Sequence, residues 1–331
     1  PKEQRESTDL GRFGLGLKTS SFSQCRQLTV ISRVDEVVTS AQWDLDLVDE
    51  RDDWLIHLLD AKDVLDTPVE ELLPNSGTIV IWRKLDRVLE GLTGLRKDQL
   101  INQRIDELDH HLSLVFHRFL DGTAGRHQAL KIRINGHQLV PFDPFCLNNK
   151  ATQIRPEEPL RIAGHVITIQ PYILPHHSKL TPSWYRLYQT RSDFISNQGV
   201  YVYRNGRLMA WGDWFRLTPK GEDTKLARVR IDFPNALDEA WTIDIKKSRA
   251  QPPQPVRERM IQILEEVTGR SRQVTKGRGR KLFNEDSHPV WNRFSGHGRI
   301  RYAISPDHPL VQSVRTRSEE RRVGKECATG C

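Results

Sequence analysis

The sequence has little that would place it in a membrane or cross-link it covalently. Although 37% of its 331 residues are hydrophobic, no apolar run approaches the roughly 18 residues of a membrane-spanning helix. Its four cysteines, Cys25, Cys146, Cys327 and Cys331, have an irregular spacing that suits neither a disulfide framework nor a metal site. The first residues have no methionine, no apolar signal region and no Arg/Ser-rich presequence, and they look like the interior of a gene. We therefore expect a cytoplasmic protein of about two domains.

Acidic residues are scarce in only one part of the chain. Residues 1–269 contain 36 basic and 37 acidic side chains, whereas residues 270–301 contain nine basic side chains and only Glu285 and Asp286 as acids. This distribution excludes a protein that coats nucleic acid over its whole surface. The basic stretch has Gly-Arg repeats interleaved with Phe283, Trp291 and Phe294. Such a pattern suits contact with a DNA backbone and a flexible basic linker equally well.

The first quarter of the chain predicts one short helix and several strands. The helix is expected at residues 17–26, directly after a glycine-rich turn, and the first strand at residues 28–33. Three further apolar segments predict strands at residues 40–48, 53–59 and 76–85. Charged or Pro/Asn/Gly turns separate these segments, so the simplest arrangement is an antiparallel meander.

The rest of the chain predicts a long helix followed by hairpins. Apolar side chains recur at helical spacing from Asp98 to Leu120. Asn135-Gly136 and Asn205-Gly206 each separate alternating apolar runs, and Asn-Gly is a strong hairpin signal because both turn residues need a positive φ. We next expect strands at residues 226–233 and 241–245 and a helix at 253–267. From Gly269 onward, SRQVTKGRGRK predicts a solvated linker.

The glycine-rich turn near the start resembles a phosphate cradle, with Gly11, Gly14 and Gly16 followed by Lys18 and Thr19. Glycines let backbone N–H groups approach an anion, a following helix directs its positive end there, and the lysine adds a full charge. Three common phosphate motifs do not fit. A P-loop needs the lysine directly after its glycine, and the dinucleotide and kinase loops need a glycine at position 19. On these residues alone, a phosphate loop and an ordinary turn are equally good explanations.

The segment GRFGLGLKTSSFSQC, residues 11–25, resembles the third nucleotide-binding motif of the GHKL ATPases. This superfamily contains gyrase, ninety-kilodalton heat-shock chaperones, histidine kinases and MutL, and the segment is most similar to the MORC-like and MutL-like branches. The resemblance implies that the loop ends a lid over ATP. It also implies that the phosphates are held by Gly11, Gly14, Gly16, Lys18 and Thr19.

Later parts of the sequence resemble the same family. Gly77-Thr78 stands where the family has a Gly-Thr on a strand, which implies that Thr78 lies near the adenine. QGVYVYRNGRLM, residues 198–209, looks like a hairpin of the family's transducer domain. WTIDIKKSRAQPP looks like the strand and loop whose lysine reaches the γ-phosphate, so Lys246 or Lys247, with Lys247 preferred, would sense the triphosphate. Without the family order, a solvated lysine pair would be the better explanation.

Two motifs of the family are not found in this sequence. They are a helix with a catalytic glutamate and a magnesium-binding asparagine, and an Asp-x-Gly-x-Gly that recognises adenine. Both would precede the glycine loop, where Glu3 and Glu6 are poor substitutes. Attack on a γ-phosphate needs Mg²⁺ and an oriented water. We therefore expect ATP hydrolysis by the intact gene product and none by this chain alone.

The expected fold class is α+β. Residues 1–92 would form the C-terminal half of a GHKL α/β sandwich, residues 93–269 a transducer-like β-α-β domain, and residues 270–316 a basic flexible extension. Arg317 to Cys327 resembles the translation of a sequencing adapter, so residues 317–331 are excluded from the fold.

The expected cofactors are ATP and Mg²⁺. ATP binding would drive lid closure, domain rearrangement and homodimerisation, with action on DNA through Arg270 to Arg301. The alternative is a non-catalytic DNA-binding or scaffold protein that retains the fold.

Other chemistry-bearing side chains are better explained by packing or solvation. The histidines invite a zinc interpretation, but no cysteine or carboxylate completes a tetrahedral set, so solvated or helix-packing roles are favoured for His110, His111, His117, His176 and His177. The aromatic residues of one hairpin are expected in a core rather than stacked on bases: Trp211, Trp214 and Phe215. Solvated faces are expected for Asp44, Asp46, Asp238 and Glu239.

Overall fold

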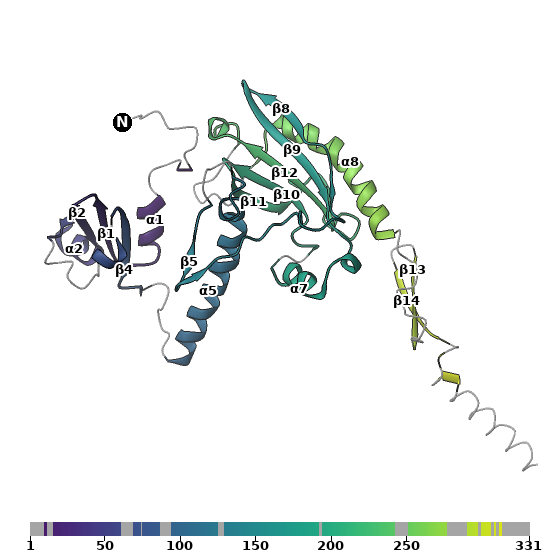
Figure 1. The fold of residues 1–331 in the computed structure, drawn as a ribbon, viewed down its shortest axis with the longest axis horizontal. Coiled ribbons are helices and arrows are strands. Elements are labelled where there is room, and N and C mark those ends of the chain that lie inside the picture. The colour runs from purple at the N-terminus through teal and green to yellow at the C-terminus, as the bar shows by residue number, and fades with distance from the viewer. Residues whose placement is uncertain are drawn as a thin grey trace, which may run out of the picture. The chain divides into compact units, whose positions relative to one another are not determined.

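The fold is α+β, and the described residues of the larger part of the chain form a four-stranded sheet, a six-stranded sheet and a small two-stranded sheet (Figure 1). The computed structural model describes residues 10–11, 16–60, 69–73, 75–86, 94–124, 129–191, 194–241, 251–276, 290–296, 299–305, 308 and 311–312. The chain divides into two units, residues 1–272 and 273–331. Among the described residues, no helix is both long enough and apolar enough to cross a membrane.

The first sheet has four antiparallel strands in the order β3-β2-β1-β4. They are β1 (Gln27–Val34), β2 (Val37–Asp44), β3 (His57–Leu58) and β4 (Gly77–Arg83), accompanied by α1 (Gly16–Phe22), α2 (Leu45–Arg51) and α3 (Val69–Leu72). The meander holds for the first three strands and is wrong for the fourth, which pairs with β1 in a Greek-key order. The two-residue β3 offers little to pair with, whereas β1 offers β4 seven register positions.

The segment expected as a strand at residues 40–48 changes to a helix at Asp44. The Asp44 carboxylate accepts a hydrogen bond from the Asp46 N–H (3.0 Å) and caps α2. Lys84 pairs with both carboxylates, and Arg26 pairs with Asp46. Burial alone would raise the pKa of Asp44, but hydrogen bonds from Lys84 and from the Asp46 N–H outweigh it and lower that pKa. Asp44 is therefore a helix cap with 9% of its side chain exposed, and the expectation of a solvated face is wrong there.

The second sheet follows the long helix, which is present as α5 (Leu95–Val115) and continues as α6 (His117–Leu120). Its strand order is β11-β10-β12-β9-β7, with β8 also on β9, and only β10 and β12 pair in parallel. The strands are β7 (Gln153–Ile154), β8 (Glu158–Ile162), β9 (His165–Ile173), β10 (Gly199–Arg204), β11 (Arg207–Asp213) and β12 (Ala227–Phe233). Between them lie η2 (His177–Lys179) and α7 (Pro182–Arg191), and η3 (Asn235–Leu237) follows β12.

Both Asn-Gly hairpins are confirmed. Asn135 and Gly136 have φ values of 49° and 81° between β5 (Arg133–Ile134) and β6 (His137–Gln138). Asn205 and Gly206 have φ values of 48° and 81° between β10 and β11. Positive φ at both central residues is the geometry that matches the twist of two paired strands. The strand expected at residues 241–245 lies mostly outside the described residues.

The core of the second sheet contains every residue of β10 and most of β12. The helix α8 (Gln254–Lys276) runs beside this sheet in Figure 1 and buries Val256, Met260, Ile263, Leu264 and Val267. It passes through Gly269 and ends at Lys276, so the linker expected from Gly269 is wrong in its first residues. A glycine inside a helix costs only about 1 kcal/mol, which the packed face of α8 outweighs.

The second unit contains a hairpin of β13 (Trp291–Gly296) and β14 (Arg299–Ile304) within the extension that was expected to be flexible. Six residue pairs join the strands, from Trp291 opposite Ile304 to Gly296 opposite Arg299. The side chains of Trp291, Tyr302 and Ile304 are more than half exposed.

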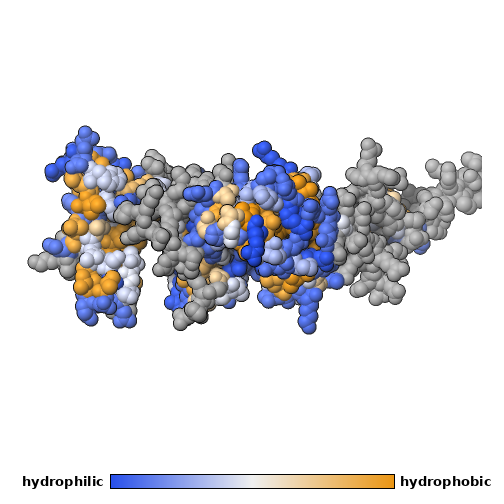
Figure 2. All heavy atoms as spheres, turned by 90° about the horizontal axis from the view of Figure 1, so that it is seen from above, coloured by the Kyte–Doolittle hydropathy of each residue, from blue (hydrophilic) through white to orange (hydrophobic). Residues whose placement is uncertain are grey.

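Hydrophobic side chains also reach the surface of the first sheet module. Figure 2 shows orange patches among blue side chains over this module, at the left of the view. The exposed hydrophobic residues there include Val34, Val37, Leu58, Val80 and Trp82. Val80 and Trp82 belong to β4, which also carries Thr78.

Candidate functional site

The helix that follows the glycine loop packs on one face of the four-stranded sheet. Leu28 of β1 lies opposite both Trp43 of β2 and Trp82 of β4, so these three side chains share a face. On that face the Trp82 Nε1–H donates to Ser21 Oγ of α1 (2.9 Å), and Ser21 is fully buried. Phe22 packs against the cluster formed with Leu28 and Trp43. The end of α1 is therefore anchored, and its first turn projects beyond the anchor.

Lys18 lies in the first turn of α1 and is exposed. Its ammonium is 5.0 Å from the centroid of the Trp43 ring, within the range of a cation–π interaction. Such a contact at an exposed site is worth about 0.5–1 kcal/mol. Thr19, the next residue, also lies on the exposed part of α1, and its hydroxyl donates to the Gly16 carbonyl at 3.5 Å. Both side chains can turn toward an anion at little cost.

Thr78 lies on the same face of the sheet as α1. It is opposite Ser32 in the strand pairing, and the two hydroxyl oxygens are 3.0 Å apart. Ser32 is four residues from Leu28 on β1, and residues four apart on a strand share a face. The Thr78 side chain is exposed. The tertiary structure thus brings Lys18 and Thr78, sixty positions apart in the sequence, to one face of one sheet.

The glycine of the Gly-Thr pair has a steric role of its own. Gly77 has φ = 152°, and a Cβ added there would lie 2.8 Å from Leu73 Cδ2. Leu73 is itself fixed, because it is 7% exposed and its carbonyl accepts a hydrogen bond from Arg33 Nη1 (3.0 Å). Gly11 and Gly16 differ from Gly77, since a Cβ at either would meet nothing within 4 Å. Neither packing nor a positive φ in the described residues explains glycine at those two positions, whereas close approach by a ligand would.

The segment before the glycine loop contacts the second sheet. The Leu10 carbonyl accepts a hydrogen bond from Arg204 Nη1 (3.1 Å), at the end of β10. Arg204 is held by a buried bidentate pair with Asp238, whose two carboxylate oxygens accept from Nε and Nη2 at 2.6 and 2.7 Å. Asp238 is only 8% exposed, so the expectation that it lies on a solvated face is wrong. A buried carboxylate requires a partner of this kind, and nothing near Asp238 in the sequence indicated which one.

Three of the expected site residues lie outside the described residues: Gly14, Lys246 and Lys247. The others, namely Gly11, Gly16, Lys18, Thr19 and Thr78, are described. The sequence did not point to Ser32, Ser21, Trp43 or Trp82, because their involvement follows from strand register and helix docking.

Among the histidines that were weighed as zinc ligands, His117 and His176 are buried, whereas His110, His111 and His177 are exposed. His117 is 4% exposed, and its Nε2 is 2.8 Å from the Tyr203 hydroxyl. Burial lowers the pKa of His117 to about 4. No group of three or more His, Cys, Asp or Glu side chains suited to a metal ion occurs among the described residues. Trp214, at 1% exposure, lies in the core as expected.

One protein family matches this chain. Residues 1–78 match the family described as histidine kinase-, DNA gyrase B- and HSP90-like ATPases. No curated protein matches at the level of sequence.

Three solved structures show a weak likeness. The B-subunit of DNA gyrase from Myxococcus xanthus is 10% identical, with 76% of this chain and 71% of that chain covered and a TM-score of 0.33. The 43K ATPase domain of Thermus thermophilus gyrase B, in complex with an aminocoumarin, is 12% identical, with 80% and 70% covered and a TM-score of 0.28. The topoisomerase IV ATP-binding domain of Francisella tularensis, in complex with a small-molecule inhibitor, is 9% identical, with 81% and 72% covered and a TM-score of 0.31. Likeness at this level is too low to transfer a function.

Proposed function

We propose that this protein binds ATP on the face of the four-stranded sheet that carries α1. The proposal starts from the match of residues 1–78 to the family of histidine kinase-, DNA gyrase B- and HSP90-like ATPases. The observation that supports this most strongly is the placement of Lys18 and Thr78 on that one face. Lys18 belongs to the loop that is expected to bind the phosphates, and Thr78 belongs to the strand that is expected near the adenine. The two were expected from separate motifs, and their placement on one face of the sheet supports the proposal.

The glycine loop would hold the phosphates through backbone amides and one lysine. Gly11 and Gly16 leave room for close approach of an anion, since a side chain there would meet nothing within 4 Å. Gly14 would act in the same way by its place in the motif. Lys18 would exchange its weak contact with Trp43 for a charge-assisted bond to a phosphate oxygen. The Thr19 hydroxyl would donate to the phosphates beside it.

The adenine end of the site would be set by Thr78. Its hydroxyl already lies 3.0 Å from the Ser32 hydroxyl, which fixes its orientation on the sheet. A hydroxyl can both donate and accept, so the pair can match either kind of atom on the edge of a base. Val80 and Trp82, both 42% exposed, offer apolar surface farther along the same strand.

When bound, ATP supplies the phosphoanhydride bond whose hydrolysis the family name describes. Lys18, Thr19 and Thr78 carry an ammonium and two hydroxyls, which suit phosphates and the edge of a base, and none of the three is a carboxylate that would hold Mg²⁺. Hydrolysis is therefore proposed for a gene product that also carries the glutamate and asparagine helix and the Asp-x-Gly-x-Gly motif. What these residues do themselves is to bind and orient the nucleotide.

Binding would then be transmitted to the second sheet. Lys247 is proposed as the sensor of the γ-phosphate, from the family order alone. The bond from Arg204 to the Leu10 carbonyl supports a second link, because it joins the residue before Gly11 to the end of β10. If the glycine loop moved toward a phosphate, it would displace the neighbouring Leu10 carbonyl and strain its hydrogen bond to Arg204. Lid closure and homodimerisation complete the proposal.

The test is nucleotide binding by the intact gene product and its Lys18→Ala variant. A hydrogen bond to a charged group is worth about 1.5–3 kcal/mol, so affinity for ATP should fall by about tenfold or more. Lys131→Ala removes an equal charge from an exposed position outside the site and should leave the affinity unchanged. Equal affinities in the wild-type protein and the Lys18→Ala variant would refute the loop assignment. Equal losses in both variants would show that bulk charge, and not this site, attracts ATP.

A role in binding DNA is proposed for the basic stretch from Arg270 to Arg301. In the hairpin of this stretch, Trp291 and Tyr302 are 57% and 60% exposed, and Arg293 is directly opposite Tyr302 in the strand pairing. Exposed aromatic rings among basic residues suit base stacking beside phosphate contacts. Affinity for single-stranded DNA should therefore fall steeply with salt and fall further in Trp291→Ala. An affinity for DNA that changes neither with salt nor in Trp291→Ala would exclude this role. The ATP proposal would not be affected.

A further inference from the structure

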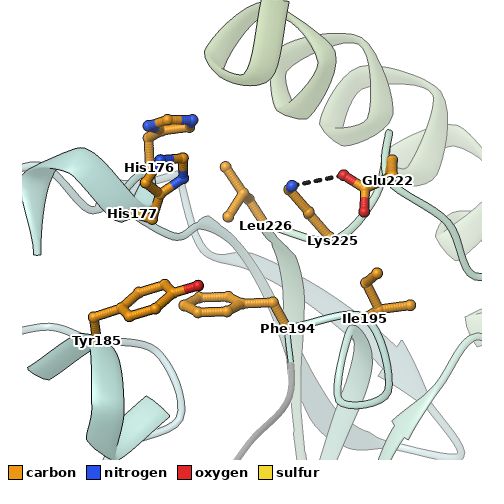
Figure 3. A pocket seen from close by; sticks show the side chains of 8 residues that line it. All are labelled: His176, His177, Tyr185, Phe194, Ile195, Glu222, Lys225 and Leu226. Carbon is orange, nitrogen blue, oxygen red and sulfur yellow. Dashed lines mark hydrogen bonds and ion pairs between the residues drawn. The ribbon is translucent and has the colours of Figure 1, made fainter. Parts of the chain in front are cut away.

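A pocket lies in the second sheet module, apart from the four-stranded sheet (Figure 3). Its volume is about 160 Å³. The walls come from the loop after β9, from α7, and from the turns before β10 and β12, and they consist of His176, His177, Tyr185, Phe194, Ile195, Glu222, Lys225 and Leu226. None of these residues was singled out for nucleotide binding, so the pocket needs its own explanation.

One side of the pocket is a rigid aromatic platform. The rings of Tyr185 and Phe194 are stacked, with centroids 6.2 Å apart and planes inclined by 22°. Phe194 stacks in turn on Tyr188, which is 1% exposed and donates its hydroxyl to the Asp143 carbonyl (2.5 Å). Figure 3 shows His177 above Tyr185, and the two rings meet edge to face, with centroids 6.2 Å apart and planes inclined by 64°. The flat surface offered to a ligand is therefore that of Tyr185 and Phe194, on which a planar ring gains contact over one whole face.

The polar side of the pocket offers a hydrogen-bond donor and an acceptor together. The Lys225 ammonium is 2.6 Å from a carboxylate oxygen of Glu222, as the dashed line in Figure 3 marks. Because this pair neutralises itself, the pocket presents no net charge to attract an anion. It presents an N–H donor next to a carboxylate acceptor, which matches a ligand edge with an acceptor next to a donor. An amide or lactam edge has this arrangement.

The volume of the pocket is enough to seat about one ring. An apolar cavity of about 150 Å³ holds one benzene molecule, and drug-sized ligands need about 300 Å³ or more. Ile195 and Leu226 line the remaining walls and offer apolar contact to the ring edge that does not hydrogen-bond.

We infer that this pocket binds a monocyclic heteroaromatic ring with an amide-like edge, the class to which pyrimidine bases belong. The ring would lie against Tyr185 and Phe194, and its amide-like edge would face Lys225 and Glu222. The base could come from a free nucleobase or nucleoside, or from a single strand that inserts one base. The inference does not depend on the ATP proposal, since the two sites share no residue.

The first experiment measures saturable binding of uracil and uridine to the full chain by ligand-observed NMR. Two probes separate the contributions: toluene has a ring without the amide edge, and δ-valerolactam has the edge without an aromatic ring. Base–aromatic stacking is worth about 1–3 kcal/mol per base, so each probe should bind at least about fivefold more weakly than uracil. Equal binding of toluene and uracil would overturn the inference, as would the absence of saturation by uracil.

Matched variants test whether the ligand occupies this pocket. Tyr185→Leu keeps an apolar side chain but removes the stacking face, and uracil affinity should fall at least about fivefold. Glu222→Gln, at a side chain that is 65% exposed, alters the acceptor with little risk to the fold and should also weaken uracil. Trp54→Leu changes an exposed aromatic residue of the first sheet module that does not line the pocket and should leave the affinity unchanged. Thermal melts confirm folding, and an affinity that survives Tyr185→Leu in a folded protein would overturn the inference.

A third measurement distinguishes the source of the base. Oligouridylate should bind more tightly than uridine, and lose that advantage in Tyr185→Leu, if a single strand inserts its base. Uridine should bind while oligouridylate does not compete, if the ligand is free. Either result supports binding of the base in this pocket. The inference is contradicted if oligouridylate still competes with uridine in the Tyr185→Leu variant.

Discussion

The pH dependence of stability should report on His117, which joins the long helix to the β10–β11 hairpin. Its Nε2 is 2.8 Å from the Tyr203 hydroxyl, and its Nδ1 has no hydrogen-bond partner among the described residues. Burial is the main cause that lowers the pKa of His117 from 6.5 to about 4. Arg118 and Arg230 act in the same direction, and Asp121 opposes them.

The magnitude and the sign follow from that lowering. Each pKa unit is worth about 1.4 kcal/mol, so the interval from 6.5 to about 4 amounts to about 3 kcal/mol. In this interval the unfolded chain binds the proton and the folded chain does not, so the free energy of unfolding rises with pH. The contribution of His117 is complete above its unfolded pKa and is lost as the pH falls toward its folded pKa.

The assay compares the wild-type chain with His117→Gln, whose amide can keep the bond to Tyr203 without titrating. Denaturant unfolding at several pH values from about 7.5 to about 4 gives the free energy of each protein, and the other titrating groups cancel in the difference. The wild type should lose about 3 kcal/mol more than the variant over this range. Parallel curves would refute the buried, neutral histidine, as would an NMR titration of its ring near pH 6.5.

Three further substitutions test the packing of both sheet modules by thermal and denaturant unfolding. Gly77→Ala should destabilise by about 1–3 kcal/mol, because it strains φ and meets Leu73; an unchanged melting temperature would refute the clash. Gly269→Ala should stabilise by about 0.5–1 kcal/mol, since it lies in α8 with open space around it, and a loss would show an unrecognised contact. Asp238→Asn should cost about 3–5 kcal/mol by leaving Arg204 buried without its charge partner, and a change below about 1 kcal/mol would place that pair at the surface.

The sequence predicted turns and helices well where their formation depends on neighbouring residues alone. Asn135-Gly136 and Asn205-Gly206 formed turns because positive φ is a property of those residues themselves. The helical spacing after Asp98 predicted α5 for the same kind of reason. The end of α8 was missed, since whether Gly269 breaks a helix depends on what the helix packs against.

The order of strands could not be predicted from local signals. The meander placed β4 next to β3, and the structure places it next to β1. Pairing between strands depends on which edge offers the longer ladder, and β1 offers far more than the two residues of β3. The burial of Asp238 was missed for a related reason, because its partner Arg204 is 34 residues away in the sequence.

The sequence by itself determined the chemistry of the candidate site: a glycine-rich loop, the lysine after it and a Gly-Thr before an apolar strand. These are properties of short segments, and a motif records them without any fold. Only the tertiary structure shows that Lys18 and Thr78 share a face of the sheet. It also shows the cation–π contact of Lys18 with Trp43 and the hydroxyl pair of Thr78 and Ser32. Strand register determines these contacts, because a shift of one residue would turn Thr78 to the opposite face of the sheet.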